Sequence, residues 1–426
     1  MDYIEKVSLE PSFDFKRYKK LTPRIFQETL KLAKELHSKK IIHINSTQLG
    51  GGVSEILRNE IPLERLLGID SNWYIIKAPI EFFKITKKIH NLLQGEKGFL
   101  KDSEKYFYLK WIYSKITPSF KRLIVNEAPQ IVIIHDPQPL PLIDYLKNNN
   151  SSFPIPVLRL HIDLSSPNPN VLDFIKPFVE EYRLVILSHK SYRPDWLAKE
   201  KTRIVMPAIN PFSEKNRLME KDEAKNILSY YHINPNQPII AQVARFDPWK
   251  DPLGTLKAYY LAKNKIPKLQ LILAGFFQAY DDPQALSVFK QVSKEAKGDP
   301  DVFLFADPSS LKDISNDLFI NAVYTVSDVI IQKSIKEGFG LTVTEAMWKG
   351  KPVIGGKTKG IGLQITDGQN GFLVTSIEEA AQKIISLLEN NEMRKRIGKM
   401  AYQTVKKKFL MSRLILDYLK IYNELF

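Results

Sequence analysis

Residues Glu337 to Glu345 read EGFGLTVTE, a glycine-bearing loop with an acidic residue at each end. The loop follows the apolar run Asp328 to Gln332 and precedes the apolar stretch Ala346 to Trp348, an order that predicts strand, loop and helix. Where such a loop becomes a helix, unpaired backbone amides and the helix dipole attract an anion, and glycine lets a phosphate come close. Two carboxylates beside a phosphate site can accept hydrogen bonds from hydroxyl groups. The stretch therefore predicts a ligand with both phosphate and sugar, such as a nucleotide sugar.

On both sides of this loop, short runs rich in β-branched residues alternate with longer stretches of helical spacing. This alternation is typical of βαβ units in a parallel sheet. In the first half the predicted strands are 40–45, 73–77, 131–135, 156–161, 184–188 and 203–206; in the second half they are 238–244, 269–275, 302–305, 328–332, 352–355 and 371–374. Six strands in each half predict an α/β protein with two Rossmann-like domains.

The segment Met206 to Glu214, MPAINPFSE, interrupts the periodicity with two prolines and is the predicted hinge. We therefore expect an N-terminal domain over residues 1–208 and a C-terminal, nucleotide-sugar-binding domain over 209–410. Residues 411–426 form a predicted helix that is a candidate to pack across the domain junction. Ligands of open α/β sheets bind beyond the carboxyl ends of the strands, so two facing domains are expected to share one active-site cleft.

Composition is that of a globular protein, with 44% hydrophobic and 26% charged residues in a chain of 426. The sequence has no apolar run of membrane-spanning length and no apolar leader at its N-terminus, which predicts a cytoplasmic protein. The absence of cysteine excludes disulfides, thiolate metal sites and a cysteine nucleophile. Abundant Lys, Ile and Glu without cysteine also suits a thermophile.

The formal net charge of +15 favours polyanions, anionic lipids or phosphorylated small molecules as partners. The lysines are spread and interrupted by acids, so we expect no nucleic acid and no stable membrane association. The richest stretch, Lys105 to Arg122, interleaves cations with aromatic residues and has two interpretations. It is a surface that contacts membranes or stacks on bases, or a helix packed on the core with its lysines extended to solvent.

Two cations follow the predicted strand 238–244, Arg245 and Lys250 in ARFDPWKDP. Two prolines stiffen this loop, and a cation pair at a strand end would hold a diphosphate and stabilise its charge as it departs. The alternative is a solvated basic surface. The EGFG loop favours the diphosphate site, because both motifs lie at strand ends of the same domain.

The two glutamates of the opening motif differ in what else explains them. Glu337 lies in irregular backbone before the helix, where a ligand is the simplest reason for a carboxylate. Glu345 completes the spacing Thr342-x-x-Glu345 of a capping box, which explains it without a ligand.

In the first half, Gly50, Gly51 and Gly52 follow the strand 40–45 and lead into a helix predicted to begin near Val53. Their spacing is not the GxGxxG dinucleotide fingerprint. They form either a permissive tight turn or a place where phosphate or sugar approaches the backbone.

Two His-x-Asp or His-Asp pairs also end predicted strands: His135 with Asp136, and His161 with Asp163. A histidine at such a place either bonds a sugar hydroxyl and shuttles a proton or is a satisfied structural group. Neither pair has metal-ligand spacing with a third partner, so no metal site is predicted. Asp299-Pro-Asp301 resembles an Asp-x-Asp metal motif but precedes a strand, and we interpret it as a loop.

These residues resemble the retaining glycosyltransferases of the two-Rossmann, or GT-B, type. The hallmark of that family is two Glu separated by seven residues, here Glu337 and Glu345, with an upstream Arg-x4-Lys, here Arg245 and Lys250. The longer strings NSTQLGGGVSEIL, HDPQP, HIDLSSPN, ARFDPWK and EGFGLTVTEAMWKGKPVIG are similar to the archaeal trehalose-forming branch of the family. The resemblance extends from about residue 40 to 410.

The resemblance implies reversible transfer of glucose from a nucleoside-diphosphate glucose to free glucose, with retention, giving trehalose. No cofactor and no obligatory metal are implied, and a homodimer is compatible with it. Catalytic roles are implied for Glu337, His161, Arg245 and Lys250. Donor-binding roles fall on Gly51, Gly52, Arg245, Lys250, Glu337, Gly338, Phe339, Gly340, Leu341, Thr342 and Glu345. Acceptor-binding roles fall on Asn45, His135, Asp136 and Asp163, which makes the N-terminal domain the acceptor side.

Two segments depart from the family pattern. After PVIG this chain has GKTKGIG, Gly356 to Gly362, with two lysines beside the expected donor site. The segment Phe303 to Asn321, expected near the nucleotide base, also fits poorly, so the sequence does not select among UDP, ADP and GDP sugars. Two alternatives remain: a trehalose phosphorylase of the same fold, and a non-catalytic basic protein that binds nucleic acid or a membrane surface.

Overall fold

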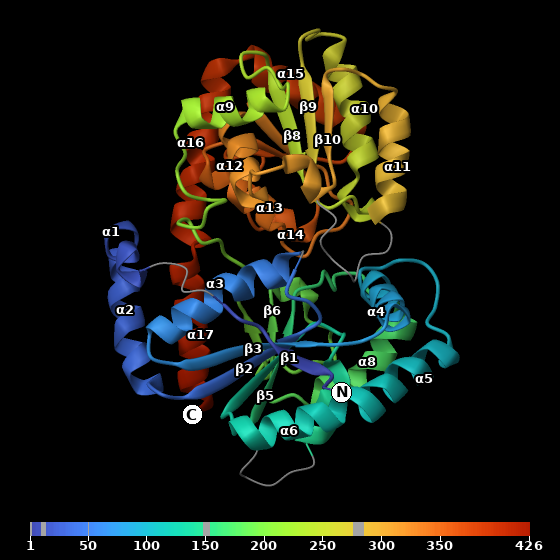
Figure 1. Ribbon diagram of the computed structural model, residues 1–426, viewed down its shortest axis with the longest axis vertical. Coiled ribbons are helices and arrows are strands. Elements are labelled where there is room, and N and C mark those ends of the chain that lie inside the picture. Colours follow the sequence, from blue (N-terminus) through green and yellow to red (C-terminus); the bar gives the residue numbers. More distant parts are fainter. Residues whose placement is uncertain (1, 10–13, 50, 148–153, 276–284) are drawn as a thin grey trace. The chain divides into compact units, whose positions relative to one another are not determined.

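A computed structural model describes residues 2–9, 14–49, 51–147, 154–275 and 285–426 of the chain. It divides into two compact units (Figure 1). The first unit comprises Met1–Pro207 and Met411–Phe426, and the second comprises the described part of Ala208–Leu410. Among the described residues, no helix combines the length and the apolar character that a membrane span requires.

The first unit is built on a seven-stranded sheet. Its strand order is β1-β3-β2-β4-β5-β6-β7, and every neighbouring pair is parallel except β1 with β3. The strands are β1 (Ile4–Lys6), β2 (Lys40–Asn45), β3 (Asp70–Ile76), β4 (Ile131–His135), β5 (Ile155–Leu160), β6 (Leu184–Leu187) and β7 (Thr202–Ile204). The order of the strands reverses between β2 and β4, which is the place where open α/β sheets generally bind their ligands.

Helices cover both faces of this sheet (Figure 1). They are α1 (Tyr18–Leu21), α2 (Pro23–Ala33), α3 (Gly52–Leu66), α4 (Ile80–Leu93), α5 (Asp102–Trp111), α6 (Thr117–Glu127), α7 (Ile143–Leu146), α8 (Pro169–Glu181) and α17 (Met411–Leu425). Helix α17 packs against α2 and α3, and its apolar face is buried within the first unit. The helix predicted for residues 411–426 is therefore present, and it belongs to the first unit, together with the N-terminal part of the chain.

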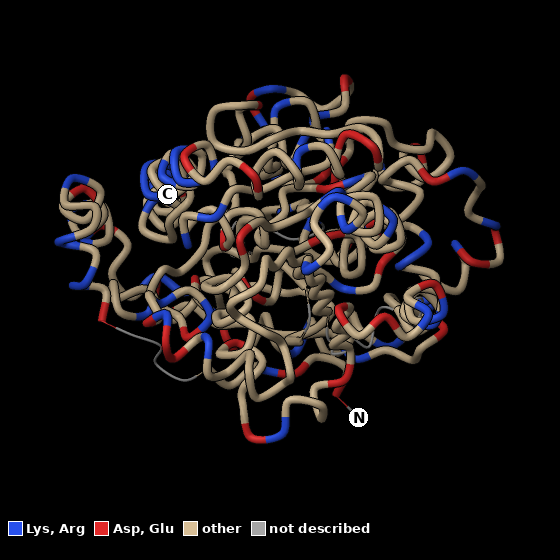
Figure 2. The backbone as a smooth tube through the Cα atoms, turned by 90° about the horizontal axis from the view of Figure 1, so that it is seen from above, with Lys and Arg blue, Asp and Glu red and all other residues tan. Residues whose placement is uncertain are grey.

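The basic aromatic stretch Lys105 to Arg122 lies in α5, the π-helical turn Ile112–Ile116 and α6. Its apolar side chains Tyr108, Ile112, Ile116 and Phe120 are buried in the core of the first unit. Lys105 lies over the ring of Phe174, with its Nζ 5.8 Å from the ring centroid. The packed helix, of the two interpretations, is the one that the structure supports. Figure 2 shows Lys and Arg interspersed with Asp and Glu along the backbone.

The second unit has a six-stranded parallel sheet in the order β10-β9-β8-β11-β12-β13. The strands are β8 (Ile239–Val243), β9 (Gln270–Ala274), β10 (Val302–Phe305), β11 (Val329–Gln332), β12 (Val353–Gly356) and β13 (Phe372–Val374). The helices are α9 (Lys221–Tyr230), α10 (Pro252–Lys263), α11 (Ala285–Ala296), α12 (Asn316–Val326), α13 (Leu341–Trp348), α14 (Lys359–Gly362), α15 (Ile377–Glu389) and α16 (Asn391–Lys408). Numbered along the chain, this is the 3-2-1-4-5-6 order of a Rossmann fold, with its switch point between β8 and β11.

Candidate active site

The switch point of the second sheet brings together the cations and the first acid of the sequence motifs. Strands β8 and β11 are parallel neighbours, so the loops at their carboxyl ends leave the same edge of the sheet. Arg245 and Lys250 lie in the loop after β8, and Glu337 lies in the loop after β11. The sequence placed these residues at strand ends, and the sheet order makes those strands adjacent.

Local hydrogen bonds hold the loop that carries Lys250. Pro248–Lys250 forms one 3-10 turn, and the Asp247 side chain accepts from the Trp249 amide at 2.8 Å to cap it. Gln242, buried on β8, donates from Nε2 to the Lys250 carbonyl at 2.7 Å. This hydrogen bond joins the backbone of Lys250 to β8. The side chain of Lys250 therefore extends from a fixed position.

Lys250 forms an ion pair with Glu337 through Nζ and Oε2. The Ser334 hydroxyl donates to the same carboxylate oxygen at 3.2 Å. Glu337 is 7% exposed and Lys250 is partly exposed. Because the two charges are opposite, burying the pair costs less than burying either charge alone. The pair therefore forms a polar surface at the strand ends before a ligand binds.

Helix α13 begins directly after the acidic loop. Its N-cap is Gly340 with φ of 86°, a left-handed conformation that favours glycine, and no side chain caps it. The capping box predicted for Thr342 and Glu345 is therefore wrong. Because the glycine starts the helix at Leu341, Thr342 is already inside the first turn and cannot be the N-cap.

Glu345 is held by tertiary contacts instead. It is 1% exposed; the Tyr324 hydroxyl donates to Oε2 at 2.9 Å, and the Lys215 ammonium lies 2.9 Å from Oε1. Tyr324 comes from α12 and Lys215 from the segment before α9. No sequence pattern indicates these two partners, because neither is a neighbour of Glu345 along the chain.

A second segment, which contains Gly360 and Gln364, packs against the acidic loop just before the start of α13. Gly360 lies so close that a Cβ there would stand 2.4 Å from the Glu337 carbonyl oxygen and 2.6 Å from the Gly338 carbonyl carbon. Gln364, 1% exposed, donates from Nε2 to the carbonyls of Phe339 at 2.6 Å and Gly340 at 3.1 Å. The segment Gly356 to Gly362, which departs from the family pattern, thus supports the acidic loop.

Replacing Gly360 with alanine is expected to displace the acidic loop, because its methyl group would overlap backbone atoms that cannot rotate away. We expect the protein to fold with a lower Tm and the turnover to fall by about tenfold or more, as for a displacement of about 1 Å at a reacting centre. Gly362→Ala is the matched control, since a Cβ at that position meets no atom within 4 Å. Equal activity of the two variants would contradict this account of the loop contact.

In the first unit, the glycine motif forms the start of α3. Gly51 is its N-cap with φ of 101°, and a Cβ there would meet no atom within 4 Å. The helix begins at Gly52, one residue before the predicted start, while Gly50 lies outside the described residues. Gly51 is therefore required for its backbone angle, and its backbone is exposed.

The predicted histidines form a row with a third one. His135 Nε2 lies 3.1 Å from His43 Nδ1, and His135 Nδ1 lies 3.1 Å from His161 Nε2. Burial, and secondly the charge of Arg159, hold the pKa of His161 well below its ordinary value. Burial and the neighbouring His43 do the same for the pKa of His135. Both rings are therefore neutral near pH 7. The sequence missed His43 because it lies inside a strand.

The remaining predicted acceptor residues are engaged within the first unit. The Asp136 side chain accepts from the His161 amide at 2.7 Å, and Asp163 accepts from the Ser165 amide at 2.8 Å. Asn45, 3% exposed, accepts from Trp73 Nε1 at 2.7 Å and donates to the Thr47 carbonyl at 2.7 Å. These contacts shape the loops at the switch point, and an acceptor role for the three side chains stays a prediction.

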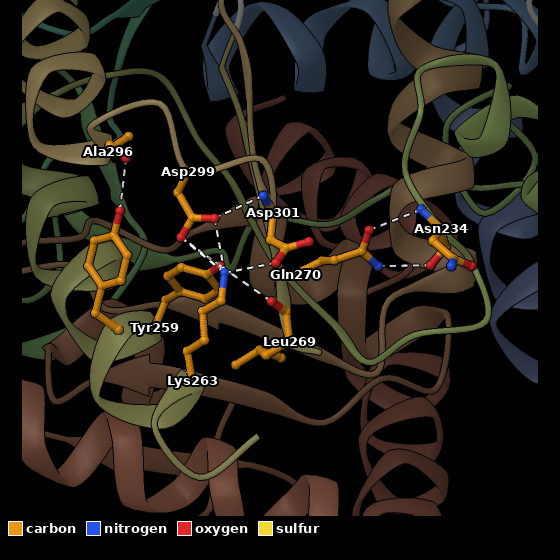
Figure 3. Close-up of polar contacts among 9 residues, drawn as sticks. Asn234, Tyr259, Lys263, Leu269, Gln270, Ala296, Asp299 and Asp301 are labelled. Carbon is orange, nitrogen blue, oxygen red and sulfur yellow. Dashed lines mark hydrogen bonds and ion pairs between the residues drawn. The ribbon is translucent and has the colours of Figure 1, made fainter. Parts of the chain in front are cut away.

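The Asp-x-Asp sequence before β10 has a different role. Lys263 on α10 places its ammonium 2.9 Å from Asp299 and 2.8 Å from Asp301, and it also donates to the Tyr259 hydroxyl at 2.8 Å (Figure 3). The two carboxylates therefore share one lysine as their ion-pair partner at the amino edge of the sheet. Their interpretation as a structural loop agrees with these contacts.

Comparison with known proteins identifies relatives over most of this chain. A family model described as "Trehalose synthase, N-terminal domain" matches residues 43–194, and one described as "Glycosyl transferases group 1" matches residues 224–404. The trehalose synthase of Pyrococcus horikoshii is 41% identical over 92% of this chain and 92% of its own length. The trehalose phosphorylase of Pleurotus pulmonarius is 29% identical over 81% of this chain and 52% of that enzyme.

Among solved structures, sucrose-phosphate synthase from Thermosynechococcus elongatus has a TM-score of 0.70 and 18% identity, covering 91% of this chain and 99% of that one. This likeness confirms the predicted GT-B fold. The trehalose synthase relatives come from thermophiles, in agreement with the composition.

Proposed function

Because this chain belongs to the trehalose synthase family of GT-B glycosyltransferases, we propose that it transfers glucose from a nucleoside-diphosphate glucose to free glucose. The product is trehalose, formed reversibly and with retention at the donor carbon. The observation that carries the proposal is the group of Arg245, Lys250 and Glu337 at the switch point of the second sheet. Such a group suits a ligand with a diphosphate next to a sugar.

The donor is proposed to bind along this edge. Arg245 and Lys250 hold the diphosphate, together with the backbone from Gly338 to Thr342 where α13 begins. Glu337 accepts hydrogen bonds from the glucose hydroxyls. Each oxygen of Glu345 has two lone pairs, so the ribose hydroxyls can donate to Glu345 while Lys215 and Tyr324 remain bound.

The first unit is proposed to bind the sugar that accepts glucose. We propose that His161 bonds the donor 6-hydroxyl; its lowered pKa keeps the ring neutral, so it can bond a hydroxyl without adding charge. Gly51 and Gly52 offer amides to phosphate or acceptor at the start of α3. Asn45, His135, Asp136 and Asp163 are proposed to hold the acceptor.

The proposed step breaks the bond between donor C1 and the diphosphate oxygen and forms a bond from the acceptor hydroxyl to C1 on the same face. The acceptor proton passes to the departing phosphate oxygen. Arg245, Lys250 and the positive end of α13 stabilise the charge on the diphosphate. Glu337 is paired with Lys250, which suits hydroxyl binding better than nucleophilic attack. The chemistry of this step requires no metal.

We also propose a cytoplasmic location and, besides the substrates, a second copy of the chain as partner.

The match to trehalose phosphorylase supports the first of the two alternative functions. A synthase is expected to form trehalose and a nucleoside diphosphate when given UDP-, ADP- or GDP-glucose with glucose. A phosphorylase forms glucose 1-phosphate from trehalose and inorganic phosphate with no nucleotide present. Glucose 1-phosphate formation without nucleotide, and no trehalose from any nucleotide glucose, would replace the proposed function by the rival.

A further inference from the structure

Three buried side chains of the first unit converge in its interior, and no proposed substrate contact uses them. His43 lies on β2, and Glu60 and Glu64 lie four residues apart on one face of α3. Each is 0% exposed. One nitrogen or oxygen atom from each of the three lies within 4.8 Å of the others.

The atoms that point into this cluster lack hydrogen-bond partners among the described residues. These atoms are both carboxylate oxygens of Glu60, Oε2 of Glu64 and Nε2 of His43. A buried carboxylate without a partner costs several kcal/mol relative to water. Arg159 attracts Glu60 through space, and its Nη2 donates to the Ser188 hydroxyl at 3.3 Å and the Val205 carbonyl at 2.7 Å. Arg159 Nε and Nη1 have no hydrogen-bond partner among the described residues, so the guanidinium makes no direct contact with Glu60. The cluster therefore has two acids and no cation in contact with them among the described residues.

We propose that His43, Glu60 and Glu64 bind a divalent metal ion, with Zn2+ as the ion that this donor set favours. One imidazole and two carboxylates are ligands that zinc accepts in a tetrahedral site, with water in the fourth position. Tetrahedral bonds of about 2.0–2.2 Å hold ligand atoms about 3.3–3.6 Å apart. His43 Nε2 and Glu64 Oε2 are already 3.4 Å apart, without the geometry of a hydrogen bond. An oxygen of Glu60 lies within 4.8 Å of both atoms, and movement of this side chain toward them would complete the site.

The groups behind the ligands fit the same assignment. The Tyr422 hydroxyl on α17 donates to Glu64 Oε1 at 2.8 Å, which leaves Oε2 for the ion. His43 has its other nitrogen, Nδ1, 3.1 Å from His135. Ligating histidines and carboxylates in proteins are oriented by such outer hydrogen bonds. The ion would join β2, α3 and α17, and this structural role does not depend on the proposed reaction.

Metal binding also fixes the protons along the histidine row. With Nε2 on the ion, neutral His43 carries its proton on Nδ1 and donates it to His135 Nε2. His135 then donates from Nδ1 to His161 Nε2, so His161 carries its proton on Nδ1. The ion would thereby set His161 as a hydrogen-bond donor on the side away from His135.

The test is a metal analysis of the full-length chain produced without a polyhistidine tag or a metal-affinity step. Unfolding in guanidinium with a chromogenic chelator is expected to release about one equivalent of Zn2+ per chain. Metal-free chain titrated with ZnCl2 is expected to take up the same amount and to gain about 5 °C or more in Tm. Glu60→Gln and Glu64→Gln are expected to lose the ion, and Glu55→Gln, on the same helix, to keep it.

The rival occupant of the cluster is a proton, because burial and the charge of Glu64 raise the pKa of Glu60 well above its ordinary range. A folded wild-type chain that contains no metal and takes up no Zn2+ on titration would overturn the metal site. This measurement on the wild type needs no variant to fold. If the chain binds no metal, nucleotide-glucose turnover would still be observed. If the proposed function is wrong, the zinc content would be unchanged.

Discussion

Replacing Lys250 with alanine is expected to lower kcat for transfer by about 10²–10³-fold, the size of effect seen when one group that stabilises developing charge is removed. Lys250 is the cation held at the switch point by the β8 strand and by Glu337. In the proposed step, negative charge grows on the diphosphate as its bond to C1 breaks, and the ammonium stabilises that charge more than it stabilises the bound donor. The loss should therefore fall on kcat more than on KM for the donor.

Arg245→Ala is expected to give a loss of the same order, since both cations lie in the loop after β8. The matched control is Lys268→Ala, which removes an exposed positive charge just before β9 at the amino edge of the same sheet. Steady-state kinetics with saturating glucose separate the effect of each variant on kcat from its effect on KM for the donor. Normal turnover of both Lys250→Ala and Arg245→Ala would contradict their role at the leaving group.

Glu337→Gln is expected to lower kcat by about 10²-fold, because it keeps the shape of the side chain but removes the charge that accepts from the donor sugar and pairs with Lys250. The 7% exposure of Glu337 makes this pair a shielded one. We expect the Lys250→Ala and Glu337→Gln effects to be non-additive by about 0.5–3 kcal/mol, as for residues in direct contact.

The measurement is a double-mutant cycle on kcat/KM, with Glu295→Gln on the exposed face of α11 as the control for losing one acid in this unit. Strictly additive losses, or a Glu337→Gln variant with the wild-type rate, would show that the ion pair does not act in the reaction. Circular dichroism and Tm of each variant establish that the loss is not one of folding.

Most of the fold follows from local sequence patterns. Each of the twelve predicted strands is present, because buried parallel strands are continuous runs of β-branched residues that adjoining helices separate clearly. Strand β1 escaped prediction: it has three residues, only Ile4 is buried, and it pairs antiparallel at the sheet edge. The unit to which α17 belongs depends on which apolar surfaces it meets in three dimensions, and an apolar helical stripe alone does not contain that information.

The grouping of the candidate site residues was predictable where it depends on strand ends and unpredictable where it depends on packing. Arg245, Lys250 and Glu337 could be expected near one another, because they follow strands that the Rossmann order places side by side; their roles stay a prediction. Gln364 and Tyr324 could not be expected there, since each reaches the acidic loop or Glu345 from another element of the chain. The capping box failed for a local reason: Gly340 adopts the left-handed conformation and takes the N-cap position that the spacing assigned to Thr342.

The central claim is tested most directly by the product itself. The protein is incubated with glucose and a nucleoside-diphosphate glucose carrying 13C at C1, and the product is identified by NMR. The proposed function predicts one labelled disaccharide, α,α-1,1-linked trehalose, with the label in the α configuration of the donor and one nucleoside diphosphate released for each molecule formed. A β configuration at the labelled carbon, a different linkage, or label recovered only as free glucose would contradict it.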